Sequence, residues 1–163
     1  MIKIEKVTVN IGVGAAGDTL DKAEKLLEKL CEQKPVRTLA KSRIPTWGVR
    51  KKMQIGVKVT MRDERAMKFL TKALGAKENK LKSTQFDDSG NFAFGISEYI
   101  DMPGVKYDPE LGIFGFDVCV TLEKDGYRVK KRKRAKAKLP NSHKLTKEES
   151  IDWVQKNLNV VVM

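Results

Sequence analysis

Four segments of the chain alternate apolar and polar residues with a period of two, and this limits the fold more than any other feature. Residues 7–11, 54–62, 92–97 and 114–122 each place their large apolar side chains on one side only. Because successive side chains of a β-strand point to opposite faces, each segment predicts a strand with one buried face. Strands of this kind are typical of antiparallel sheets, since parallel sheets are usually covered on both faces.

Helical spacing of apolar residues fills the intervals between the strands. Asp18 is expected to cap a helix that ends before Pro35, and Asp63 a second helix that Gly75 stops. The first helix should bury Leu20, Ala23, Leu26, Leu27, Leu30 and Cys31, and the second Ala66, Met67, Leu70, Ala73 and Leu74.

A third helix is expected near the C-terminus, where Thr146 and Glu149 form a capping box ahead of Ile151, Trp153, Val154 and Leu158. Together these elements predict an α+β fold, an antiparallel sheet with helices packed on one face and the other face open. The expected division is an α+β domain at 1–125, a basic extension at 126–144, and a C-terminal helix and tail at 145–163.

The charge balance points to a polyanionic partner. The chain carries 33 Lys and Arg against 21 Asp and Glu, a net charge of +12. From 128 to 138, eight of eleven residues are cationic and none is acidic, so we expect this block to be extended or disordered until an anion is present. Its cations are Arg128, Lys130, Lys131, Arg132, Lys133, Arg134, Lys136 and Lys138.

Several classes of function are excluded by what the chain lacks. Cys31 and Cys119 are far apart and His143 is the single histidine, so no metal site, disulfide framework or Cys-His catalytic pair is expected. No apolar run reaches the roughly 18 residues of a membrane span, and the N-terminus does not resemble a signal peptide. We therefore expect a soluble, cytoplasmic protein without cofactor or metal and with reduced thiols.

One motif suggests an enzyme but fails in its context. Residues 12–17 satisfy the Gly-x-Gly-x-x-Gly pattern of dinucleotide-binding proteins. That fold needs a first strand buried on both faces and an acidic residue at the end of a second strand, whereas residues 33–37 offer none. The glycines are more simply explained by a turn with positive φ.

The polar side of the sheet is a candidate RNA surface. Its members are short or cationic, so folded RNA could approach closely and find hydrogen bonds and positive charge. The alternative is an ordinary solvated face, which any one-sided sheet needs. The residues are Thr8, Asn10, Lys58, Thr60, Arg62, Ala93, Gly95, Asp117 and Thr121.

The segment 41–53 is predicted to be a long basic loop after a brief strand. It combines five cations with Trp47 and no acid, a composition suited to a phosphate backbone with an indole free to stack. Alternatively, the loop is merely solvated and Trp47 packs into the core, where tryptophan usually lies.

The chain also resembles a known family nearly end to end: the fifth protein of the large ribosomal subunit, in its archaeal and eukaryotic branch. The resemblance rests on residues 9–14, 33–36, 55–62, 90–96, 98–109, 112–116 and 143–149. Two differences from the bacterial branch stand out. That branch has a longer N-terminal helix and lacks the basic block 128–138.

This resemblance implies a non-enzymatic protein that joins 5S ribosomal RNA to the large subunit in the central protuberance, beside large-subunit RNA and neighbouring ribosomal proteins. Asn10, Gln33 and Thr60 match residues that hold 5S RNA in the family, and we expect Lys34, Lys58 and Arg62 to join them. The basic loop would contact transfer RNA in the peptidyl site through Arg43, Trp47, Arg50, Lys51 and Lys52. A free-standing RNA chaperone is the alternative.

Overall fold

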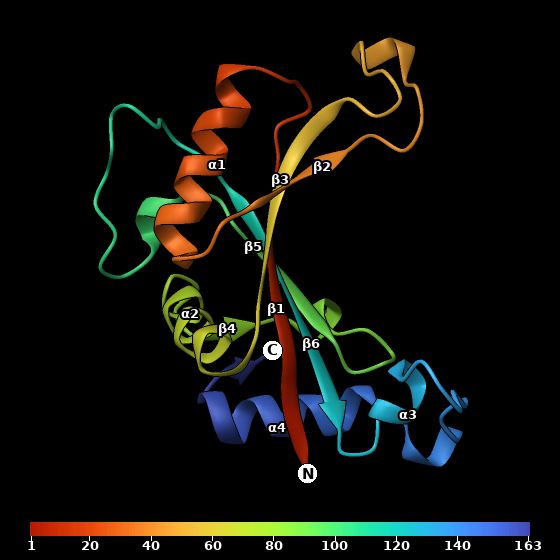
Figure 1. The fold of residues 1–163 in the computed structure, drawn as a ribbon. Helices are drawn as coiled ribbons and strands as arrows, with labels where there is room; N and C mark the ends of the chain where they lie inside the picture. Colours follow the sequence, from red (N-terminus) through yellow and green to blue (C-terminus); the bar gives the residue numbers. More distant parts are fainter. The chain divides into compact units, whose positions relative to one another are not determined.

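The computed structural model describes residues 1–163 and confirms the α+β class (Figure 1). A five-stranded antiparallel sheet has the strand order β2-β3-β1-β6-β5. Its strands are β1 (Ile2–Gly12), β2 (Val36–Leu39), β3 (Gln54–Met61), β5 (Phe92–Ile96) and β6 (Phe116–Lys124). A parallel pair is formed by β4 (Lys80–Leu81) and β7 (Val161–Val162).

The helices are α1 (Asp18–Cys31), α2 (Asp63–Gly75), α3 (Arg128–Lys131) and α4 (Lys147–Leu158). Single 3₁₀ turns are η1 (Pro45–Trp47), η2 (Ser83–Gln85), η3 (Tyr99–Asp101) and η4 (Asn141–His143). None of these helices has the length and apolar character needed to span a membrane.

The chain forms two compact units. The central unit comprises residues 8–61 and 95–118, and the terminal unit comprises residues 1–7, 62–94 and 119–163. Strands β1, β5 and β6 contribute residues to both. The division into 1–125, 126–144 and 145–163 stays a prediction.

In the central unit, α1 packs against the apolar side of β3. Leu20, Leu26 and Leu27 of α1 are fully buried, as are Val57 and Val59 of β3. Burying such aliphatic side chains contributes about 1.5–3 kcal/mol each. The expected helical and strand patterns are confirmed here, except that Leu30 is only half-buried.

Both expected aspartate caps are wrong by one residue. Gly17 is the N-cap of α1 at φ 125°, and Arg62 is the N-cap of α2; neither makes a side-chain capping bond. Asp18 and Asp63 are instead the first helical residues. A carboxylate there still interacts favourably with the positive end of the helix, so aspartate near a helix start does not identify which position it occupies.

In the terminal unit, α2 buries Phe69 and leaves Met67 39% exposed, so the expectation that Met67 is a core residue is wrong. The buried stripe runs through Ala66, Leu70 and Ala73, which follow helical spacing. Phe69 lies on that stripe, whereas Met67 lies about 100° around the helix from Ala66. The capping box of α4 is confirmed: the Glu149 amide donates to Thr146 Oγ1 at 3.4 Å, and the Thr146 amide donates to Glu149 Oε2 at 3.1 Å.

Gly90 is a position where a side chain cannot be accommodated. Its φ is +76°, and an added Cβ would meet Ser150 Oγ and lie 2.7 Å from Leu145 Cδ2. We expect Gly90→Ala to lower the free energy of unfolding by about 1–3 kcal/mol, through overpacking and left-handed strain. Urea denaturation measures this. Gly104→Ala is the control, because Gly104 has φ +84° but open space around it; an equal loss in both variants would contradict the packing argument.

Candidate nucleic-acid interface

The polar side of the central unit brings several expected RNA-binding residues together. The Val13 amide donates to the Ile55 carbonyl, and a Cβ at Gly56 would lie 3.6 Å from Gly12 Cα, so Gly12 and Gly56 are neighbours on adjacent strands. Two residues farther along, this antiparallel register places Asn10 beside Lys58. The same register places Thr8 beside Thr60. On its other side, Lys58 pairs with Val36 of β2.

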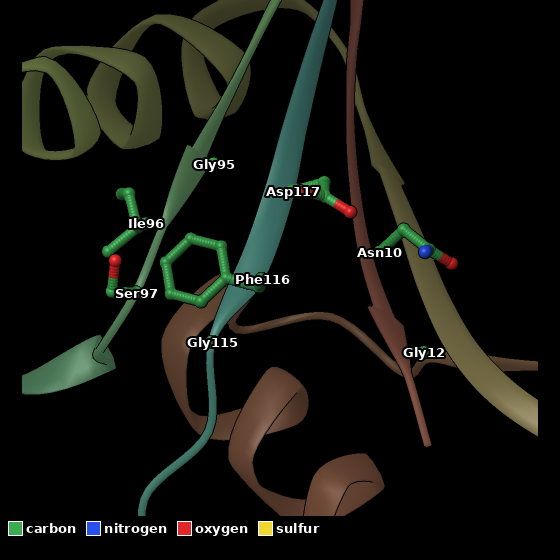
Figure 2. A pocket seen from close by; sticks show the side chains of 8 residues that line it. All are labelled: Asn10, Gly12, Gly95, Ile96, Ser97, Gly115, Phe116 and Asp117. Carbon is green, nitrogen blue, oxygen red and sulfur yellow. The ribbon is translucent and has the colours of Figure 1, made fainter. Parts of the chain in front are cut away.

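A shallow depression of about 420 Å³ lies on this polar side, next to Asn10 (Figure 2). Gly12, Gly95 and Gly115 form part of its lining, so backbone is exposed where side chains would otherwise stand. Asn10 and Asp117 project beside it from neighbouring strands. A glycine within a strand often marks the close approach of a ligand or another backbone. The depression therefore admits a backbone-sized group beside a hydrogen-bonding amide.

Gln33 lies just beyond α1, where Glu32 adopts the left-handed conformation that ends the helix. Its side-chain amide donates to the carbonyl oxygen of Thr60 at 3.3 Å. Gln33 and Thr60 are thus brought together although they are 27 positions apart in the chain. The adjacent Lys34 is exposed.

The basic loop is the braced end of the β2–β3 hairpin. Ile44 and Val49 exchange backbone hydrogen bonds, and the Ala40 amide donates to the Met53 carbonyl at 2.8 Å. Ala40 and Val49 are buried, whereas Trp47 is 75% exposed. The interpretation that Trp47 packs into the core is therefore wrong. All five cations, namely Lys41, Arg43, Arg50, Lys51 and Lys52, are exposed (Figure 1).

The glycine segment 12–17 forms a turn rather than a dinucleotide site. Gly14 and Gly17 have positive φ, as expected. The strand before it, β1, lies between β3 and β6 in an antiparallel sheet, whereas the dinucleotide fingerprint belongs to a parallel β-α-β unit. No three metal-ligating side chains come together anywhere in the structure.

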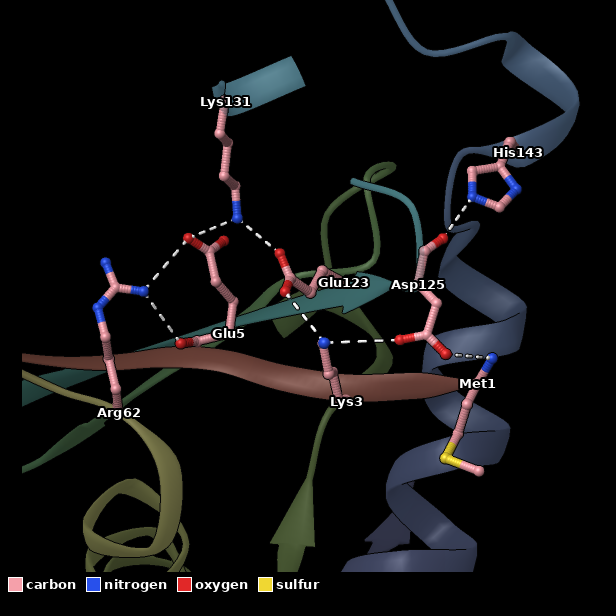
Figure 3. A network of polar contacts seen from close by, with 8 residues as sticks. All are labelled: Met1, Lys3, Glu5, Arg62, Glu123, Asp125, Lys131 and His143. Carbon is pink, nitrogen blue, oxygen red and sulfur yellow. Dashed lines mark hydrogen bonds and ion pairs between the residues drawn. The ribbon is translucent and has the colours of Figure 1, made fainter. Parts of the chain in front are cut away.

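The polar side of the terminal unit differs from the expected open basic face. Arg62 Nη1 donates to the Glu5 carbonyl at 3.2 Å and lies 3.6 Å from Glu5 Oε1. Lys131 spans Glu5 and Glu123 above the same surface (Figure 3). The block 128–138 is therefore not wholly extended or disordered. Residues 128–131 form α3, because folding brings carboxylates from β1 and β6 to a segment that has none nearby in sequence.

The two thiols differ in accessibility. Cys31 is buried in α1, and this burial raises the pKa of its thiol to about 12. Cys119 is exposed on β6, two residues beyond Asp117. At neutral pH only Cys119 should react with an alkylating reagent, which makes it a built-in reporter for the polar side of the strand.

Sequence patterns missed two features of these surfaces. The lining of the depression includes Gly12 and Gly115, which stand at strand ends and so fall outside the alternation that defined the polar face. The Glu5–Glu123 pair was missed because the alternation changes phase within β1. Glu5 reaches the polar side with Glu123, although Val7, of the same parity, is fully buried. The partly buried Ile2 and Ile4, whose parity is opposite to that of Val7, are the signal that could have shown it.

Comparison with known proteins gives one consistent result. Residues 1–50 match the family model of ribosomal protein L5, and residues 54–153 match that of the ribosomal L5 family C-terminus. The chain is 52% identical to the large ribosomal subunit protein uL5 of Methanosphaera stadtmanae, over 98% of this chain and 95% of the relative. It is 53% identical to that of Archaeoglobus fulgidus (99% and 89%) and 49% identical to that of Sulfurisphaera tokodaii (99% and 92%).

Proposed function

The chain belongs to the ribosomal protein L5 family, whose members are large-subunit ribosomal proteins rather than enzymes, and on that premise we propose that it binds 5S ribosomal RNA through the polar side of its central unit. As a ribosomal protein it works on the cytoplasmic ribosome among ribosomal RNA and other ribosomal proteins. We further propose that it helps attach 5S RNA to the large subunit in the central protuberance.

The observation that carries this proposal is the glycine-lined depression with Asn10 at its side. RNA helices are recognised largely by shape and by contacts to phosphate and 2′-hydroxyl groups, which needs close approach and small polar side chains. Asn10, Thr60 and Lys58 supply an amide, a hydroxyl and an ammonium on adjacent strands. No aromatic side chain lines up for base stacking on this surface, which favours folded RNA over single strands.

Gln33 supports the site by position. Its amide donates to the Thr60 carbonyl and so ties the end of α1 to β3, next to the exposed Lys34. The side-chain oxygen of Gln33 has no hydrogen-bond partner within the protein, so it can accept a bond from a 2′-hydroxyl group.

A binding assay tests the proposed function directly. In a gel shift, the protein should bind 5S RNA more tightly than a length-matched RNA hairpin, and 5S RNA should slow the alkylation of Cys119. Equal affinity for both RNAs would instead support a free-standing RNA chaperone. Unchanged Cys119 reactivity in a saturated complex would remove the β6 side of the sheet from the contact.

The hairpin end is proposed to contact transfer RNA in the peptidyl site, because it carries an exposed indole among five exposed cations. Changing Arg50, Lys51 and Lys52 to Ala should weaken transfer RNA binding to assembled ribosomes while isolated 5S RNA binding stays largely intact. The matched control changes Lys22, Lys25 and Lys68, which are exposed on α1 and α2. If the hairpin variant loses 5S RNA affinity as severely as a variant of the sheet residues, hairpin and sheet form one site.

A further inference from the structure

Two carboxylates lie side by side on the polar side of the terminal unit. Glu5 of β1 and Glu123 of β6 have side chains only 13% and 16% exposed. Lys131 Nζ lies 2.8 Å from Glu5 Oε1 and 2.6 Å from Glu123 Oε2, so a single ammonium bridges both (Figure 3). Arg62 and Lys3 approach from the sheet at 3.6 and 3.8 Å and complete the cluster.

The bridging ammonium is committed to the protein. Half-buried carboxylates need a partner, because desolvation penalises an unpaired charge. Burial raises the pKa of the Glu5 carboxyl, but the hydrogen bond and charge of Lys131, with the charges of Lys6 and Arg62, outweigh it and hold that pKa below its usual value. Burial lowers the pKa of the Lys131 ammonium, but the hydrogen bonds to Glu123 and Glu5 outweigh it and the pKa is raised.

The segment that Lys131 holds down encloses a cavity of about 1070 Å³ against the sheet. Thr121 and Leu122 of β6 line it on one side, and residues 136–139 line it on the other. Five lysines contribute to the lining, against only two carboxylates, those of Glu5 and Asp88. Glu5 is already paired with Lys131. The cavity is therefore cationic.

Three of these lysines have no partner within the protein: Lys130, Lys136 and Lys138 form no ion pair or side-chain hydrogen bond. The other two are engaged, since Lys131 bridges the carboxylates and Lys144 donates to Asn141 Oδ1 at 2.8 Å. Free ammonium groups around an open cavity are suited to phosphate oxygens, which accept charge-assisted hydrogen bonds.

We propose that the cations of the basic extension, residues 126–144, divide into two kinds: Lys131 anchors the extension to Glu5 and Glu123, and Lys130, Lys136 and Lys138 bind RNA phosphates at the cavity that this anchor maintains. The division rests on the proposed RNA-binding function. It assigns the eight cations of 128–138 unequal roles, although the sequence presents them as one uniform block.

Two measurements on the full-length protein test the division. Hydrogen exchange of residues 126–145 without RNA reports the anchor, and the slope of log affinity against log salt reports phosphate contacts. Lys131→Gln, and separately Glu5→Gln with Glu123→Gln, should remove the exchange protection of the extension. Lys131→Gln should leave the salt slope unchanged. The glutamate variant releases an ammonium, so its slope should steepen by up to about 0.7–0.9.

Replacing Lys130, Lys136 and Lys138 by Gln gives the opposite pattern. The slope should shrink by about 2.1–2.7, while the exchange protection stays as in the wild type. Unchanged protection in Lys131→Gln would overturn the anchor, and a slope loss of about one contact in that variant would make Lys131 a phosphate ligand. The slopes are measured on both 5S RNA and the length-matched hairpin, so a failure of 5S selectivity would not be mistaken for a failure of this division.

Discussion

Changing Asn10 and Thr60 together to alanine is expected to weaken 5S RNA binding by at least about thirtyfold, with the fold intact. Removing the partner of a buried polar group costs about 1–3 kcal/mol, so two such losses amount to about 2 kcal/mol or more. Both side chains are half-buried on the polar side of the central unit, away from the core. Gel shift or filter binding measures the affinity, and circular dichroism checks the fold.

Thr84→Ala is the matched control, because Thr84 is an exposed threonine on η2. Its removal should leave 5S RNA affinity unchanged. Unchanged affinity in the Asn10 and Thr60 variant, with a native dichroism spectrum, would remove the sheet surface from the proposed site. A loss confined to Asn10→Ala would restrict the contact to the neighbourhood of the depression.

Replacing Lys130, Lys133, Lys136 and Lys138 by glutamine should flatten the salt dependence of RNA binding. Each phosphate contact contributes roughly 0.7–0.9 to the slope of log affinity against log salt. If all four are contacts, the loss of affinity between about 50 and 200 mM salt shrinks by a factor of about 50–150. Preference among RNA sequences should hardly change, because phosphate contacts position a protein without reading bases.

The RNA for this titration is 5S RNA joined to its large-subunit RNA neighbours. The control replaces Lys22, Lys25, Lys68 and Lys72 by glutamine, which lowers the net charge equally but on the exposed sides of α1 and α2. A similar flattening in both variants would mean that only the overall charge matters. An identical slope for the wild type and the extension variant would mean that these four cations touch no RNA.

The alternation of residues predicted the sheet well, because it records burial directly. Phe92, Phe94 and Ile96 are all buried, as are Val57 and Val59. Strand ends were less well predicted. β1 extends from Ile2 rather than from residue 7, because its first residues alternate in the opposite phase, and β6 begins at Phe116 rather than at residue 114.

Contacts between distant segments could not be predicted from local patterns. Nothing in residues 128–138 shows that Lys131 meets Glu5, because that pairing depends on how the chain returns over the sheet. The bond from Gln33 to the Thr60 carbonyl depends equally on how α1 ends against β3. The basic loop was correctly placed in the sequence, but its bracing comes from backbone hydrogen bonds that composition does not reveal.

The bracing of the hairpin end has a mechanical consequence. A slack loop absorbs a push at its tip by changing its own dihedral angles, whereas a loop whose two sides are hydrogen-bonded to each other moves as a lever. A displacement of Trp47 is therefore transmitted past the Ala40–Met53 bond into β3, the strand that carries Lys58 and Thr60. If transfer RNA meets the tip and 5S RNA meets the strand, the two RNAs are joined by a single stiff linkage about one hairpin long.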